Sequence, residues 1–226
     1  MTESRTKKTL RNTWFSFIYK ISDVVLAFIL RTIFIHTLDK AYLGLNGLFT
    51  NIMTVLSLME LGVGSAIVFS LYKPLAEKDG GKIAALMQIY KKTYNIIGIL
   101  VCVVGLVITP FLKYIVNLPN NVSDIYLIYW LSIANTAVTY FLAYRRSLLM
   151  ADQRNDINIK NQIIFRFTRF IALAIILVTT HNFILYLIAD VINTLISNIS
   201  ITCTIKKKYA YVDKAVIEPL TKEEKQ

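Results

Sequence analysis

Six long apolar stretches determine what this chain can fold into. Each is about as long as the 17–25 residues that an α-helix needs to cross the hydrocarbon core of a bilayer. Backbone groups in lipid have no water to bond, so these stretches have to satisfy their hydrogen bonds as helices. We therefore predict an all-α integral membrane protein with six transmembrane helices. The predicted spans are about 14–36, 43–72, 94–116, 125–144, 163–180 and 183–205.

The positive charge of the chain, formally +11, is distributed unevenly. Lysine and arginine concentrate at both ends and in every second connection, whereas the other connections hold only Lys40 and Lys113. This asymmetry follows the rule that basic loops stay inside, so it places both termini in the cytoplasm. The basic charge is then a topology signal with an added attraction to anionic headgroups of the bilayer. We do not expect a nucleic acid partner.

The composition divides the chain into three parts. Residues 1–13 form a basic cytoplasmic leader, and residues 14–205 form one six-helix lobe. Residues 206–226 turn polar and are expected to be a cytoplasmic linker that is cut short at the end of the sequence. In the basic loop 73–92 we expect a turn at Gly80–Gly81, followed by a short amphipathic helix over Ile83–Tyr90 at the membrane surface.

Charged residues inside predicted spans are the best local guide to function, because they are costly in lipid. In the first span Ser16, Lys20, Asp23, Ala27 and Arg31 recur at spacings of four, three, four and four. Lys20 and Arg31 are therefore only about 20° apart around the helix axis. An alternative is that Lys20 reaches the inner headgroups and Arg31 the outer ones. That alternative leaves the deeper Asp23 unexplained.

A second polar stripe runs through the next span from Asn46 to Gly64 and contains Glu60. Because this helix returns toward the cytoplasm, Glu60 falls at a depth similar to that of Asp23. Two carboxylates and two polar stripes favour a water-filled interior over a simple packing seam of small residues, which is the alternative. The predicted residues of this cavity, for substrate or ion coupling, are Lys20, Asp23, Arg31, Asn46 and Glu60.

Four arginines gather near the predicted inner surface: Arg145, Arg146, Arg166 and Arg169. The arginine fork matches phosphate oxygens, so these residues are candidates for contact with a phosphate headgroup. The alternative is that arginine at helix ends only fixes topology. Asp190, in the sixth span, has no evident partner in the sequence.

The sequence contains no catalytic or metal-binding motif, such as a phosphate-binding glycine loop or paired histidines. Cys102 and Cys203 have neither metal spacing nor a disulfide pattern. We therefore expect a protein that is not an enzyme and holds no metal or organic cofactor, with coupling to H⁺ or Na⁺ as an open alternative.

Several segments carry a resemblance to a known family. They are YLGLNGLFTNI (Tyr42–Ile52), ELGVGSAIVFSLYKPLAE (Glu60–Glu77), AYRRSLLMADQ (Ala143–Gln153) and the tail KKYAYVDKAVIEPLTKEEK (Lys207–Lys225). Together they resemble bacterial polysaccharide flippases, which belong to the superfamily of multidrug and oligosaccharidyl-lipid exporters. The likeness extends over essentially the whole chain.

The resemblance implies one lobe of a V-shaped transporter, in which two six-helix lobes face each other across a cavity. Such flippases move undecaprenyl-diphosphate-linked oligosaccharide across the bacterial plasma membrane by alternating access. This chain matches only the amino-terminal lobe. It is thus expected to need a carboxy-terminal lobe or a second half-protein, because two-lobed transporters bind substrate between their repeats. The alternatives are one lobe of a cation-coupled multidrug exporter and a non-transporting scaffold of a glycan-assembly complex.

Overall fold

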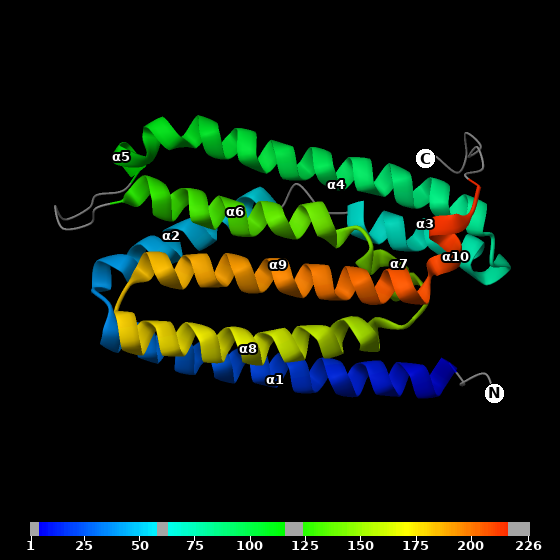
Figure 1. The fold of residues 1–226 in the computed structure, drawn as a ribbon, viewed down its shortest axis with the longest axis horizontal. Helices are drawn as coiled ribbons and strands as arrows, with labels where there is room; N and C mark the ends of the chain where they lie inside the picture. Colours follow the sequence, from blue (N-terminus) through cyan, green and yellow to red (C-terminus); the bar gives the residue numbers. More distant parts are fainter. Residues whose placement is uncertain (1–4, 58–62, 116–123, 217–226) are drawn as a thin grey trace.

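The fold of the chain is given by a computed structural model that describes residues 5–57, 63–115 and 124–216 (Figure 1). Within these ranges every regular element is helical. The elements are α1 (Arg5–Thr37), α2 (Lys40–Ser57), α3 (Val63–Glu77), α4 (Gly80–Ile108), the 3₁₀ turn η2 (Thr109–Phe111), α5 (Leu112–Ile115), α6 (Ile125–Ala143), α7 (Arg146–Ala151), α8 (Asn155–Thr180), α9 (Phe183–Lys208) and α10 (Ala210–Lys214).

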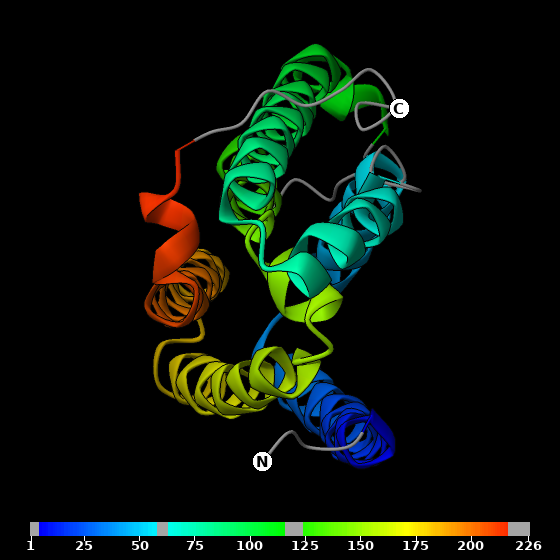
Figure 2. The ribbon, with the colours of Figure 1, turned by 90° about the vertical axis from the view of Figure 1, so that its right-hand side faces the viewer.

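The long helices run side by side and form one elongated bundle (Figure 1). In the end-on view, α4, α6, α9, α8 and α1 follow one another around the bundle, with α3 on the opposite side and α7 between them (Figure 2). The strongest packing joins α1 to α8, α6 to both α4 and α9, and α8 to α9. The beginning of α1 and the short helix α10 lie at the same end of the bundle (Figure 1).

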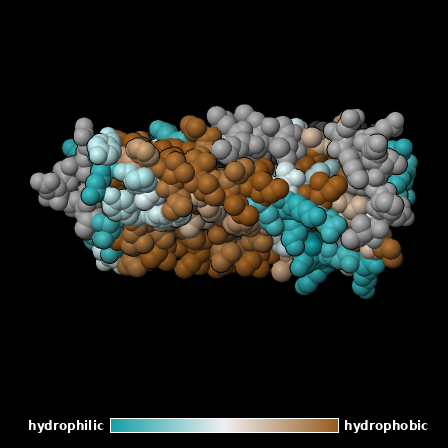
Figure 3. All heavy atoms as spheres, turned by 90° about the horizontal axis from the view of Figure 1, so that it is seen from above, coloured by the Kyte–Doolittle hydropathy of each residue, from teal (hydrophilic) through white to brown (hydrophobic). Residues whose placement is uncertain are grey.

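Four helical segments of the described residues are long and apolar enough to cross a membrane. They are Gly80–Ile115, Ile125–Leu142, Asn155–Thr180 and Phe183–Lys208. The surface agrees, because large apolar side chains such as Phe28, Phe69 and Leu106 are exposed. The view in Figure 3 shows a broad apolar belt bounded by hydrophilic residues. The prediction of an all-helical membrane protein is thus confirmed.

The first two predicted spans are not among these four segments. The first corresponds to α1, which is one continuous helix but carries Lys20, Asp23 and Arg31 within the predicted span. The second corresponds to α2 and α3, and residues 58–62 between them lie outside the described residues. The number of six crossings therefore stays a prediction.

The loop before the third predicted span differs from the expectation. The chain turns at Lys78, which has a left-handed φ of 56°, and α4 begins directly after Asp79. The Asp79 side chain accepts a hydrogen bond from the Lys82 amide at 2.9 Å, as an N-cap does. The expected separate helix over Ile83–Tyr90 was wrong, since these residues are the first turns of a helix that continues to Ile108. No glycine or proline interrupts the helix between Gly81 and Gly98.

Two glycines allow α4 and α6 to approach closely. A Cβ atom added to Gly105 would lie 2.4 Å from Cδ1 of Ile133, and one added to Gly98 would lie 2.9 Å from the Phe141 ring. The Tyr129 hydroxyl also donates a hydrogen bond to the Gly105 carbonyl at 3.1 Å. Small residues serve helix packing in lipid in this way, because no hydrophobic effect drives the helices together there.

We expect Gly105→Ala to destabilise the bundle by about 1–3 kcal/mol, the usual cost of overpacking a filled core. Ile133 is only 1% exposed, so it has little room to move away from the new methyl group. Unfolding of the purified protein in mixed micelles, followed by circular dichroism, measures the effect. Gly44→Ala is the matched control, since nothing lies within 4 Å of that Cβ position. Equal stabilities of the two variants would contradict the close contact.

Candidate functional site

Three open, partly polar cavities adjoin one another between the helices of the bundle. The first, about 560 Å³, lies between α2, α6, α8 and α9 and includes Thr50, Asn135 and Asp190 in its lining. The second, about 490 Å³, lies between α1, α2, α8 and α9, and the third, about 250 Å³, between α1, α6, α7, α8 and α9. Arg169 lines all three, so they adjoin one another around this side chain, and together we call them the polar region.

At the centre of this region Arg169 and Asp190 form a two-pronged ion pair. The NH2 group of Arg169 donates to Oδ2 of Asp190 at 2.9 Å, and its Nε donates to Oδ1 of the same carboxylate. Asn135 of α6 adds a third bond, from Nδ2 to Oδ2 at 3.1 Å. The structure therefore supplies the partner of Asp190 that was not evident in the sequence. Its partner comes from the antiparallel neighbour α8, which a search along α9 alone does not reveal.

A second ion pair joins α1 to α8. The NH2 group of Arg166 contacts Oδ1 of Asp23, and both side chains are partly accessible, at 23% and 21% exposure. Asp23 thus lies on the face of α1 that packs along α8. Lys20, one turn earlier on the same helix, is exposed. The structure therefore places Asp23 beside an arginine that the sequence had assigned to a different group.

Arg31 and Asn46 are brought together as the sequence suggested. Both line the second cavity, one from α1 and the other from α2, and share it with Arg169 and Tyr186. Glu60, the remaining residue of the predicted cavity, lies outside the described residues. The predicted polar stripes of the first two spans thus meet an arginine of α8 that was predicted separately.

The four predicted phosphate-contacting arginines divide into two groups. Arg146, Arg166 and Arg169 line the third cavity. The Arg146 guanidinium donates to the amide oxygens of Asn198 at 2.6 Å and Asn158 at 3.3 Å. Burial lowers the pKa of Arg146 below its ordinary value.

Arg145 lies elsewhere, at the end of the bundle where α1 begins. Its guanidinium pairs with Asp213 of α10, with NH2 and Oδ1 3.1 Å apart, and lies over the Tyr144 ring at 5.5 Å from the centroid. These contacts raise the pKa of Arg145 although partial burial opposes the change. Arg145 therefore holds α10 in place.

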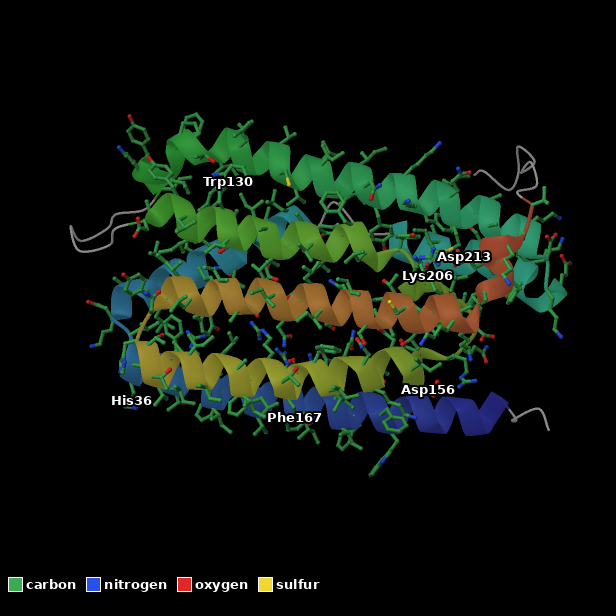
Figure 4. All side chains as sticks on the ribbon, viewed as in Figure 1. His36, Trp130, Asp156, Phe167, Lys206 and Asp213 are labelled. Carbon is green, nitrogen blue, oxygen red and sulfur yellow. The ribbon has the colours of Figure 1, made fainter. Side chains whose placement is uncertain are left out.

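The polar face of α9 was missed in the sequence. Asp190, Asn193, Thr194, Ser197 and Asn198 follow the spacing three, one, three, one, which puts them on one side of the helix. They face α8, and nitrogen- and oxygen-bearing side chains fill the space between the two helices (Figure 4). Ser197 donates to Asn161 and Asn193 donates to Thr168, each at 3.3 Å. The alternating three and one spacing of these residues is the sequence signal that indicates this face.

The segment after α9 folds back against the bundle. The Tyr209 hydroxyl donates to Oδ2 of Asp152 at 2.7 Å, and Tyr209 and Val212 are both buried. Burial, together with the bond to Asp152, raises the pKa of Tyr209 well above its usual range. Asp213, Lys206 and Asp156 mark this end of the bundle in Figure 4, opposite His36. We call this contact region, made by Tyr209–Asp213 on α4, α9 and the residues Arg145 and Asp152 that flank α7, the α10 clasp.

A helical bundle with an apolar belt and with charged side chains between its helices is the architecture of a multi-pass membrane protein. The family model described as "Polysaccharide biosynthesis protein" matches residues 9–223, so the chain belongs to this family. No curated protein and no solved structure shows a significant match to it. Among the described residues, no three His, Cys, Asp or Glu side chains gather closely enough to hold a metal ion.

We expect Arg169 and Asp190 to be strongly coupled in stability. Removing one partner leaves the other charge in a site of low dielectric, whereas removing both leaves two neutral groups. A double-mutant cycle of Arg169→Gln and Asp190→Asn, measured by unfolding in mixed micelles, should give a coupling free energy of about 1–3 kcal/mol. The Arg145–Asp213 pair is the control, since exposed pairs couple by about 0.2–1 kcal/mol. If the destabilisation of the double variant equals the sum of the two single effects, a direct interaction between Arg169 and Asp190 is ruled out.

The Tyr209–Asp152 bond predicts a stability that depends on pH. Because the folded pKa of Tyr209 is raised, its contribution is complete below the unfolded tyrosine pKa of about 10 and is lost as the pH rises further. Wild type should exceed Tyr209→Phe by about 1 kcal/mol near pH 8, and the difference should shrink above about pH 10. Thermal unfolding at several pH values measures it. The exposed Tyr114, as Tyr114→Phe, should show no such difference at any pH.

Proposed function

We propose that this chain is the amino-terminal lobe of a flippase that moves undecaprenyl-diphosphate-linked oligosaccharide across the bacterial plasma membrane for polysaccharide biosynthesis. One observation carries the proposal. The polar region contains four arginines, Arg31, Arg146, Arg166 and Arg169, against the two carboxylates Asp23 and Asp190 among the described residues. An excess of arginine within an apolar belt suits a diphosphate, which arginine binds with two parallel hydrogen bonds.

The proposed topology has six crossings with both termini in the cytoplasm. α1 and the combined α2 and α3 would add two crossings to the four apolar segments. The end of the bundle that holds the start of α1 also holds α10 and the basic residues Lys206–Lys208. A basic end of this kind supports a cytoplasmic position.

Polar residues that the bundle leaves exposed indicate where a second protein surface would pack against this lobe. Lys20, Arg31, Thr50, Asn51 and Thr54 are exposed on α1 and α2. Charged and polar side chains facing lipid are costly, so a second protein surface would cover them. A second lobe placed there encloses the cavity and permits alternating access, with an H⁺ or Na⁺ gradient as the source of directionality. Without such a partner, the chain is not expected to transport.

Export in cells tests the proposal. With the chromosomal copy deleted, lipid-linked oligosaccharide should accumulate, and surface polysaccharide should return when the native gene is restored. Arg31→Gln should lower export by about tenfold or more at unchanged protein abundance, because a hydrogen bond to a charged group contributes about 1.5–3 kcal/mol. Lys113→Gln, which changes an exposed lysine of α5, is the charge-matched control. Undiminished export in Arg31→Gln cells would contradict a cavity that binds the headgroup.

Assays in the same cells distinguish the flippase from the two alternatives, a cation-coupled drug exporter and a non-transporting scaffold. A drug exporter would restore resistance to a cationic dye without changing the lipid-linked oligosaccharide pool. A scaffold would tolerate Arg31→Gln but fail when Lys82, Lys91 and Lys92 are neutralised. The arginine excess of the cavity favours neither alternative, since it repels cations and is not needed for attachment to a membrane surface.

A further inference from the structure

A further cavity lies beside the α10 clasp, on the side of the bundle away from α1 (Figure 2). It measures about 230 Å³ and lies between α4, the end of α6 and α10. Gln88, Lys91, Arg145 and Asp213 are among the polar residues that line it. None of the residues around it also lines the polar region. We call this separate cavity the clasp pocket.

Lys91 supplies an uncompensated positive charge to the clasp pocket. Asp213 lines the same pocket, but its carboxylate is already paired with the guanidinium of Arg145. Among the residues that the structure describes, no carboxylate pairs with Lys91, whose side chain is exposed. Gln88, one turn earlier on α4, is exposed as well and adds an amide that can donate hydrogen bonds. A cation beside an amide donor suits an oxyanion such as a phosphate group.

The lengths of α4 and α6 place the clasp pocket at the level of the lipid headgroups. Lys91 and Lys113 flank the apolar part of the segment Gly80–Ile115 and are roughly 33 Å apart, at about 1.5 Å per residue. Arg145 lies roughly 30 Å beyond the start of α6 by the same measure. The hydrocarbon core is about 30 Å thick, so each helix reaches the membrane surface at these residues. In Figure 3 the apolar belt gives way to hydrophilic residues toward this end.

Apolar side chains adjoin the clasp pocket on the side that faces the hydrocarbon core. Phe141 lies four residues before Arg145 and is 38% exposed, with its ring against Gly98 of α4. Ile99, next to that glycine, is 55% exposed. The pocket itself is smaller than the 300–1,000 Å³ that usually enclose a whole small molecule, so it suits a headgroup. A ligand with a charged head and apolar chains would contact both surfaces, whereas a soluble phosphate would contact only one.

We propose that the clasp pocket binds the headgroup of an anionic phospholipid of the surrounding bilayer. Lys91 and Gln88 donate to the phosphate oxygens, and the acyl chains lie over Phe141. Because Lys91 lies on α4 and Asp213 on α10, the bound headgroup contacts both helices and holds α10 in place. The inference goes beyond the proposed function, since this lipid is a resident of the bilayer and is not the transported molecule.

Lipid binding to the purified full chain in a neutral detergent tests the pocket. Native mass spectrometry counts the bound molecules as phosphatidylglycerol is added. Lys91→Gln should weaken binding of the first phosphatidylglycerol about fivefold, the equivalent of about 1 kcal/mol for one lysine near a headgroup. Lys92→Gln is the matched control, because it removes the same charge from the next residue of α4, which does not line the pocket. This control should bind the lipid as wild type does.

A conservative variant and a second measurement strengthen the test. Lys91→Arg keeps the positive charge and should retain the affinity that Lys91→Gln loses. Hydrogen exchange reports on α10 directly. At a lipid concentration about four times the dissociation constant, phosphatidylglycerol should slow amide exchange over Ala210–Lys214 about fivefold, because a ligand that binds only the closed state stabilises it in proportion to its occupancy. The same lipid should leave this exchange unchanged in Lys91→Gln.

Four outcomes would overturn the proposal. Equal loss of binding in Lys91→Gln and Lys92→Gln would show a diffuse attraction in place of a pocket. Equal binding of the zwitterionic phosphatidylcholine would remove the role of the charge. Glycerol phosphate that binds as tightly as phosphatidylglycerol would make the occupant a soluble phosphate and not a lipid. Exchange over α10 that ignores phosphatidylglycerol in wild type would remove the contact between the headgroup and α10.

The test is independent of the proposed function, because none of these measurements depends on transport. Normal export in Arg31→Gln cells would contradict the flippase proposal and leave the clasp pocket untouched. Failure of phosphatidylglycerol to bind would overturn the clasp pocket and leave the export experiment unaffected.

Discussion

Charges inside an apolar belt have to be compensated, and this requirement organises the interior of the bundle. The Arg169–Asp190 pair, with Asn135, joins α6, α8 and α9 at one point. A lone guanidinium or carboxylate there would carry a large desolvation cost, which each partner reduces for the other. The cavities around the pair are polar because the same residues line them. The packing of these three helices and the chemistry of the cavity therefore depend on the same side chains.

The need to compensate charges within the apolar belt also explains how α1 is held against α8. α1 packs along α8 and contributes Asp23 to an ion pair with Arg166, whereas its contact with its sequence neighbour α2 is slight. The space between α1 and α2 is part of the polar region and is lined by Arg31 and Asn46. The first helix is thus a wall of the cavity, held mainly from one side. Its outer surface, with Phe28 and other exposed apolar side chains, is suited to lipid.

The helical membrane character was predictable from the sequence, because hydropathy and charge asymmetry depend on local composition alone. The polar stripes of the first two spans were also readable, and Arg31 and Asn46 do share a cavity. The pairing of Asp190 with Arg169 was not predictable in this way, since it depends on which helices become neighbours and in what register. The extent of α4 was missed for a different reason. Two adjacent lysines, Lys91 and Lys92, suggest the end of a loop by their charge, whereas exposed lysines are equally compatible with a continuing helix.

The α10 clasp determines how the chain leaves the bundle. Tyr209 is bonded to Asp152, Asp213 is paired with Arg145, and Ala215 lies so near Gly80 that an added Cβ would be 3.2 Å from it. The exit point is therefore fixed to the start of α4 and to the connection between α6 and α8. Any tilt of those helices would move residue 216 as part of the same rigid body. The clasp therefore couples the position of residue 216 to the orientation of the helix bundle.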